Sequence, residues 1–162
     1  MTELPQVICP YCRKDAELLR DSSPLYRGRN YGPVWVCRPC DAWVGVHLNS
    51  PRFLPLGRLA NAELRKAKMD AHAAFDPLWQ RKLLKLEKIK GSKRRARGDG
   101  YYWLSQQLGI PFEDCHIGMF DVDMCKRVVE ICAPYHPDMR SKKPAAPEKP
   151  KPSVNDPKYF LC

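Results

Sequence analysis

The sequence predicts an α+β fold, and three features of the 162-residue chain point to it. Two Cys-x-x-Cys pairs lie in an N-terminal segment, residues 5–50, that is rich in strand-forming residues. Residues 51–139 carry apolar side chains at helical spacing. Residues 140–162 are rich in proline and lysine without periodicity, which is typical of a disordered tail. We therefore expect a small β module packed on a bundle of about four helices, followed by a disordered C-terminal tail.

Strand signals surround the second cysteine pair. Residues 34–36 (Val-Trp-Val) lead directly into Cys37, and residues 43–46 (Trp-Val-Gly-Val) follow Cys40. Such β-branched and aromatic residues favour the pleated, half-buried surface of a sheet. The stretches 21–24 and 27–30 carry Asp, Ser, Pro, Gly and Asn, so we expect turns there.

Two helices are expected directly after the β module. Asn61 is a suitable N-cap for the first helix, which should end near Phe75. Asp76 as an N-cap and Pro77 at the first helical position should then stop that helix and begin the second.

The last two helices are expected beyond a glycine-rich break that ends at Gly100. The third should carry Tyr101 and close at Gly109, which would take the left-handed C-cap position. Asp121 is the expected N-cap of the fourth.

Composition favours a globular protein of the cytoplasm. The chain is 44% hydrophobic, and no run approaches the roughly 18 apolar residues of a membrane span. The N-terminal residues lack the basic and apolar regions of a signal peptide. A net charge of +10, from 28 Lys and Arg against 18 Asp and Glu, favours acidic partners such as nucleic acid. A solvated basic face and tail would give the same charge.

The paired cysteines predict one structural Zn²⁺ site, which makes the β module a zinc ribbon. Structural zinc takes four tetrahedral N or S ligands, and two residues between paired cysteines let both sulfurs point at one ion. The predicted ligands are Cys9, Cys12, Cys37 and Cys40. Another thiolate-bound metal such as iron is an alternative. The Cys-Pro-Tyr-Cys of the first pair also resembles the active-site tetrapeptide of glutaredoxins, but no Thr-Val-Pro segment follows it.

The remaining thiols, imidazoles and carboxylates give weaker candidates. A second metal site could be drawn from five residues: Cys115, His116, Cys125, Cys132 and His136. Because two of these cysteines share an apolar helical stripe, buried thiols are the better interpretation. A nuclease-like metal site could be drawn from His116 with Asp114, Asp121 and Asp123. Acids near a helix start are normal caps, so we predict no catalytic residue.

The densest charge run lies in residues 81–97. Its basic residues are Arg81, Lys82, Lys85, Lys88, Lys90, Lys93, Arg94, Arg95 and Arg97. Glu87 is the single acid in this run. Such a surface can neutralise several phosphates with little sequence specificity, so these nine residues are predicted to bind nucleic acid. A solvated helix face is the alternative.

Several motifs in residues 5–132 occur together in a known pattern. They are Cys9-Pro10-Tyr11-Cys12, Val36 to His47, Pro55 to Ala60, Lys68 to Trp79, Trp103-Leu104 and Cys115 to Asp121. Together they resemble a small zinc-finger-containing family of unknown function that is common in bacteria, phages and prophages. The resemblance implies zinc binding but no particular activity. It also implies that the segment from Cys115 to Asp121 is a family hallmark, so His116 and Asp121 are possible functional residues.

These observations favour a zinc-binding, non-enzymatic nucleic-acid-binding or regulatory accessory protein. The resemblance implies a bacterial or phage protein, and we expect a phage or prophage to encode it. The alternative is a protein-interaction module that binds and modulates a host enzyme. A metal-dependent enzyme is the third hypothesis. Nucleic acid is the expected partner, a host protein the alternative, and neither a membrane nor a small-molecule substrate is expected. The expected location is the cytoplasm of a bacterial cell or of a phage-infected host.

Overall fold

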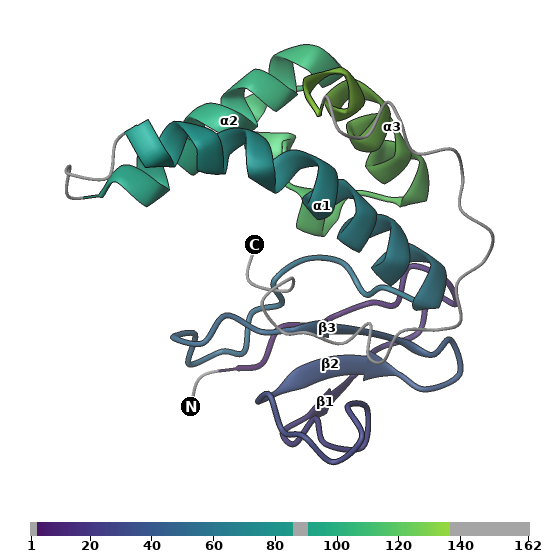
Figure 1. Ribbon diagram of the computed structural model, residues 1–162. Coiled ribbons are helices and arrows are strands. Elements are labelled where there is room, and N and C mark those ends of the chain that lie inside the picture. Colours follow the sequence, from purple (N-terminus) through teal and green to yellow (C-terminus); the bar gives the residue numbers. More distant parts are fainter. Residues whose placement is uncertain (1–2, 86–90, 137–162) are drawn as a thin grey trace. The chain divides into compact units, whose positions relative to one another are not determined.

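Figure 1 shows the computed structural model, which describes residues 3–85 and 91–136. The predicted tail at 140–162 and two predicted phosphate contacts, Lys88 and Lys90, lie outside the described residues. By its internal contacts the described chain divides into two compact units, residues 3–66 and residues 67–136. The domain boundaries expected from the sequence, at 50 and 139, stay predictions.

The first unit is built on a small antiparallel sheet. Its strands are β1 (Glu17–Leu19), β2 (Val34–Cys37) and β3 (Ala42–Gly45), in the order β1-β2-β3. Trp35 pairs with Leu18 on one side and with Val44 on the other. All four residues of the central strand are buried, as its Val-Trp-Val-Cys sequence predicts.

Both faces of this sheet carry a hydrophobic cluster. Trp35 and Cys37 pack on one face with Val44 and Leu59. Val34 and Val36 point to the opposite face, in a cluster with Tyr26 and Trp43. Successive side chains of a strand alternate between the faces, so four residues of β2 serve two clusters.

The helix α1 (Ala62–Lys85) corrects the prediction of two helices in this part of the chain. Asn61 is its N-cap as predicted, since its side-chain oxygen accepts from the Leu64 N–H at 3.0 Å. The helix continues through Pro77. Asp76 therefore lies inside the helix and is not an N-cap. Its carboxylate accepts from the indole of Trp79 at 3.0 Å. Phe75 and Trp79, buried on either side of Pro77, hold this stretch in one helix despite the lost backbone bond.

The helix α2 (Ser92–Leu108) begins well before the predicted start at Tyr101 and passes through Gly98 and Gly100. Gly100 is there for packing: a Cβ at this position would lie 2.9 Å from the Cβ of Trp79. The glycine therefore lets α2 approach α1 closely. At the other end, Gly109 has a φ of 69° and is the left-handed C-cap that the sequence predicts.

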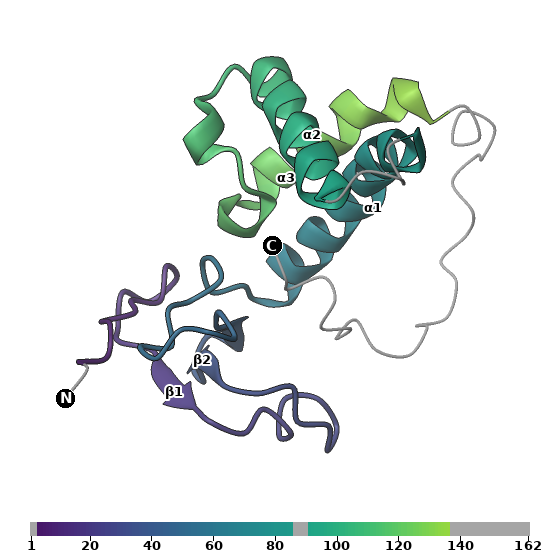
Figure 2. The ribbon, with the colours of Figure 1, turned by 90° about the vertical axis from the view of Figure 1, so that its left-hand side faces the viewer.

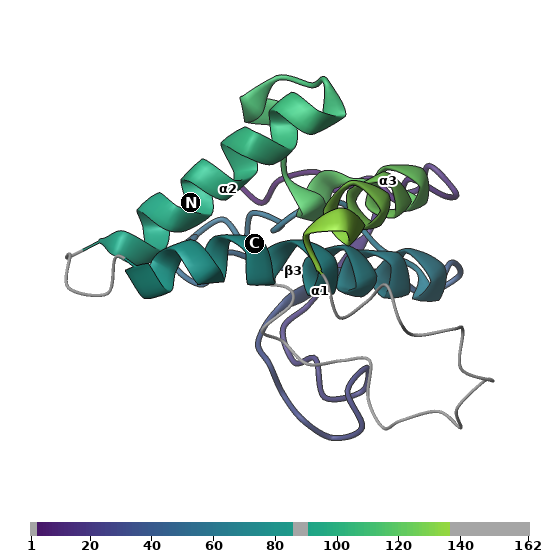
Figure 3. The ribbon, with the colours of Figure 1, turned by 45° about the horizontal axis from the view of Figure 1, so that its top comes forward.

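The helix α3 (Val122–Cys132) begins at the predicted N-cap, since the Asp121 carboxylate accepts from the Met124 N–H at 2.9 Å. The described residues thus contain three α-helices rather than about four. Short 3₁₀ turns complete the unit: η1 (Phe112–Asp114), η2 (Ile117–Met119) and η3 (Ala133–Tyr135). The three α-helices gather into one bundle (Figures 2 and 3). None of the described helices has the length and apolar character that a membrane crossing needs.

Candidate functional site

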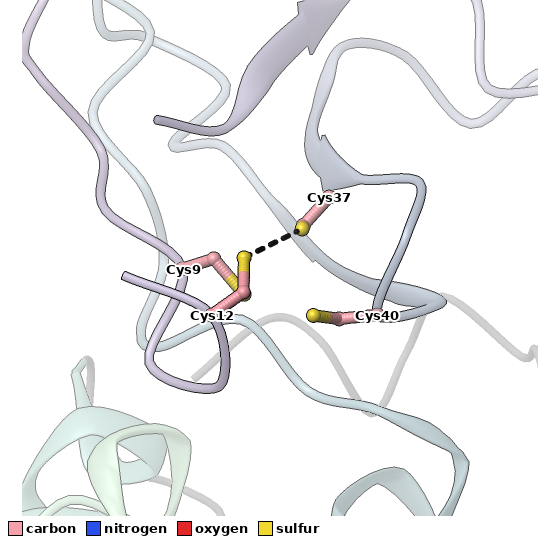
Figure 4. Close-up of side chains that lie close together, drawn as sticks. All are labelled: Cys9, Cys12, Cys37 and Cys40. Carbon is pink, nitrogen blue, oxygen red and sulfur yellow. Dashed lines mark hydrogen bonds between the residues drawn. The ribbon is translucent and has the colours of Figure 1, made fainter. Parts of the chain in front are cut away.

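The four predicted zinc ligands converge in the first unit. The sulfur atoms of Cys9, Cys12, Cys37 and Cys40 all lie within 4.8 Å of one another (Figure 4). The sulfurs of Cys12 and Cys37 are 3.5 Å apart. A tetrahedral ion with Zn–S bonds of about 2.3 Å would separate its sulfurs by roughly 3.8 Å. The cluster therefore fits a zinc ion without rearrangement of the backbone.

Each cysteine pair sits in a tight turn whose next residue is left-handed. In the first turn the Arg13 N–H donates to the Cys9 carbonyl at 2.9 Å, and Arg13 has a φ of 62°. In the second turn the Asp41 N–H donates to the Arg38 carbonyl at 3.1 Å, and Asp41 has a φ of 47°. The second turn joins β2 to β3, so strand pairing fixes the position of Cys37.

The electrostatics of the cluster favour a cation. A backbone hydrogen bond from Lys14 lowers the pKa of Cys12 to about 7. Burial and the neighbouring sulfurs raise the pKa of Cys40 to about 12, and burial also raises that of Cys37. Four adjacent thiols cannot all ionise without a compensating charge, and a bound Zn²⁺ supplies it. The glutaredoxin-like alternative lacks its parallel sheet, because the sheet found among the described residues is antiparallel.

The structure brings together seven of the nine predicted phosphate-binding residues, which we call the basic cluster. They come from the last turns of α1 and the first turns of α2: Arg81, Lys82, Lys85, Lys93, Arg94, Arg95 and Arg97. These two helix ends lie side by side, while α3 lies at the other end of the bundle (Figures 1 and 3). Lys82 pairs with Asp99, which ties the two helix ends to each other.

Residues 93–97 of the basic cluster correct one expectation, because they lie within the glycine-rich break that the sequence predicts before Gly100. They form the first turns of α2. Lys93, Arg94 and Arg95 are exposed, whereas Arg97 is half-buried with its guanidinium carbon 5.5 Å from the centroid of the Tyr101 ring. The cluster therefore has a defined shape on a helical scaffold.

His116 and Asp121 lie close in sequence but have separate surroundings. His116 is exposed, and its ring centroid is 5.7 Å from that of Tyr101. Asp121 caps α3. Within the described residues the four-cysteine group is the only set of three or more His, Cys, Asp or Glu ligands that converges, so neither alternative metal site is assembled there.

The other described cysteines are buried thiols. Burial raises the pKa of Cys115 and of Cys125 to about 11, and that of Cys132 to about 12. They are therefore protonated near neutral pH and act as small apolar side chains.

Sequence reasoning missed two features. A cavity beside the basic cluster is lined by Trp79, Trp103 and Tyr135, which belong to three separate elements. In the first unit Arg65 is buried against Trp43. An arginine within a helical pattern is expected to face solvent. Its burial becomes evident only when the neighbouring residues are placed in space.

Comparison with known proteins agrees with this geometry. Residues 5–135 match the family described as a zinc-finger-containing domain. No curated protein and no solved structure shows a significant match. The match covers most of the 162 residues and includes all four clustered cysteines. The chain therefore belongs to the zinc-finger-containing domain family, and Cys9, Cys12, Cys37 and Cys40 form its zinc site.

Proposed function

We propose that this protein is a non-enzymatic nucleic-acid-binding accessory protein. In this proposal zinc stabilises the first unit and the basic cluster of the second contacts phosphates. The observation that carries it is the proximity of two helix ends (Figure 1) that together carry seven basic residues, of which Lys82 pairs with Asp99.

The charges at the start of α2 support phosphate binding over a merely solvated face. The first turn of α2 contains no acidic residue, and its N-cap, Gly91, offers no side-chain cap. A helix N-terminus carries partial positive charge and free N–H groups, so Lys93, Arg94 and Arg95 lie at the electrostatically unfavourable end. A bound phosphate would offset the positive charge at this helix end and accept hydrogen bonds from its free N–H groups.

Three of the seven cations have no ion pair with a described residue that would compete with a phosphate. Lys85, Lys93 and Arg94 form no ion pair with any described residue. They can therefore approach a phosphate without first breaking a contact within the protein. Binding of this kind releases counterions and weakens steeply with salt.

The test is a salt titration of binding to fluorescent duplex and single-stranded oligonucleotides with the zinc-loaded full chain. The variant reverses Arg94 and Arg95 to Glu. We expect log K to fall linearly with log salt, and the double reversal to make the duplex slope shallower by roughly 1.8, at about 0.9 per lost contact.

The control reverses two adjacent basic residues on α3, Lys126 and Arg127, both exposed. It changes the net charge equally but lies away from the cluster. An equal loss of affinity in both variants would show that net charge alone explains the effect. Absence of wild-type binding at low salt would refute the proposal.

Exposed apolar residues of the first unit favour a second function, binding of a protein partner. Leu48 is 77% exposed, and Ile8, Tyr11 and Leu54 are also exposed. A partner retained from nuclease-treated bacterial lysate by the wild type, and lost with Leu48→Asp, would support this function. Retention by both proteins would count against a role for Leu48 in partner binding.

A further inference from the structure

The second unit contains a cavity that is both aromatic and basic. Its volume is about 690 Å³, within the roughly 300–1,000 Å³ typical of ligand pockets. The aromatic lining comes from buried Phe75 and Trp79, half-buried Trp103 and exposed Tyr135. Trp103 and Tyr135 pack edge to face, with ring centroids 5.2 Å apart.

The cavity lining carries more positive than negative charge. Arg81, Lys82 and Lys85 are cationic, and Asp99 is the carboxylate, so the lining has a net charge of about +2 (three minus one). A neutral apolar ligand would desolvate these groups without replacing their hydrogen bonds. The complementary ligand presents a flat aromatic surface and a negative charge.

We propose that this cavity holds one unpaired nucleotide of a single-stranded nucleic acid, with its base against Trp103 and Tyr135 and its phosphate on Arg81 and Lys85. The proposal rests on the proposed function and deepens it, because it names the strand form that the protein prefers. The cavity joins the basic cluster through the three cations that belong to both.

Arg81 is positioned for this role by the backbone around it. Its Nη2 donates to the Tyr135 carbonyl at 3.0 Å, and its Nε donates to the Pro77 carbonyl at 3.3 Å. A guanidinium has five N–H donors, so the remaining ones can face a phosphate oxygen while these two hold the group in place. The same bonds tie η3, and with it the ring of Tyr135, to α1.

Asp99 supplies a hydrogen-bond acceptor for the edge of a base. The Lys82 ammonium holds the pKa of Asp99 below its usual range, so the carboxylate is ionised and can only accept hydrogen bonds. The amino and imino groups of bases are donors. In a duplex those groups are paired and the base faces are stacked, so a base must be unpaired to enter the cavity.

The experiment uses the zinc-loaded full chain with Tyr135→Ala. Its matched control is Tyr102→Ala, because Tyr102 is also exposed, also pairs with another aromatic ring (Phe112) and does not line the cavity. Affinity is measured for a single-stranded oligonucleotide and for the duplex of the same length, at several salt concentrations.

We expect Tyr135→Ala to weaken single-strand binding about 5- to 150-fold, the equivalent of about 1–3 kcal/mol for one stacked base. The salt slope and the duplex affinity should stay unchanged, since no phosphate contact is removed. Tyr102→Ala should behave as the wild type. A second variant, Trp103→Leu, should repeat the loss while circular dichroism reports an intact fold.

Failure of this proposal differs from failure of the proposed function. Equal single-strand affinity for the wild type, Tyr135→Ala and Trp103→Leu would overturn the cavity assignment and leave phosphate binding intact. Absence of wild-type binding to both strand forms would overturn both. If a mononucleotide then still quenched tryptophan fluorescence in the wild type and not in Tyr135→Ala, the occupant would be a free nucleotide instead of a strand.

Discussion

The guanidinium carbon of Arg65 lies 3.4 Å from the centroid of the Trp43 ring, and the arginine is only 6% exposed. Its Nη1 donates to the carbonyl of Asp41 at 3.0 Å and to that of Ala60 at 2.7 Å. Asp41 directly follows the zinc ligand Cys40. One side chain from the first turns of α1 thereby connects the zinc turn, β3 and the segment that leads into the helix.

Arg65→Ala should destabilise the zinc-loaded protein by about 2–4 kcal/mol. The variant loses a desolvated cation–π contact and leaves the Asp41 carbonyl without its donor, while the Ala60 carbonyl keeps its bond from the Trp43 N–H. Arg65→Lys should rescue less than half of the loss, because an ammonium cannot stack on the indole and reach both carbonyls together. Urea unfolding followed by tryptophan fluorescence measures this, and a loss below about 0.5 kcal/mol would show that the contact is not stabilising.

Zinc should be bound at one ion per chain and should stabilise the first unit. Cys37→Ser should lower the zinc content measured by elemental analysis and reduce the β-sheet signal in circular dichroism, since β2 ends at this ligand. Cys125→Ala removes a buried cysteine outside the cluster and should keep one zinc ion per chain. Equal zinc loss in the two variants would contradict the assigned ligands.

Zinc affinity should fall as the pH falls. The ligands bind as thiolates, and burial raises the pKa of Cys37 and Cys40, the latter to about 12. These thiols are therefore protonated at neutral pH without metal, and zinc must displace their protons. Competition with a coloured chelator between pH 8 and pH 5 should show weaker binding at each lower pH. An affinity independent of pH would mean that the ligand set does not consist of these thiols.

Gly100→Ala should destabilise the second unit by about 1–3 kcal/mol, because the added Cβ would lie 2.9 Å from the Cβ of Trp79 and 3.2 Å from Cζ of Phe75. Gly98→Ala in the same helix is the matched control, since nothing lies within 4 Å of its added Cβ. It should stabilise by about 0.5–1 kcal/mol. Thermal unfolding compares the two, and a neutral Gly100→Ala would show that α1 and α2 can separate without cost.

Features that depend on local chemistry could be predicted from the order of the amino acids. The spacing of Cys9, Cys12, Cys37 and Cys40 identifies the zinc ligands, because two intervening residues already orient both sulfurs of a pair. Asn61, Gly109 and Asp121 were predicted as caps, since a cap needs only its own side chain or φ angle and the next turn of backbone. The strands around the second pair follow from β-branched and aromatic residues.

The continuation of the helices through Pro77 and the glycines, and the cavity between the helices, depend on packing between distant residues. Pro77 and the glycines of α2 read as breaks because local propensity disfavours them in helices by about 1–3 kcal/mol. Packing of Phe75 and Trp79 against Gly100 outweighs that preference. The Arg65–Trp43 contact and the aromatic cavity also require residues distant in sequence to meet in space. Periodicity along the chain does not predict such contacts, because they depend on how buried side chains from separate elements pack together.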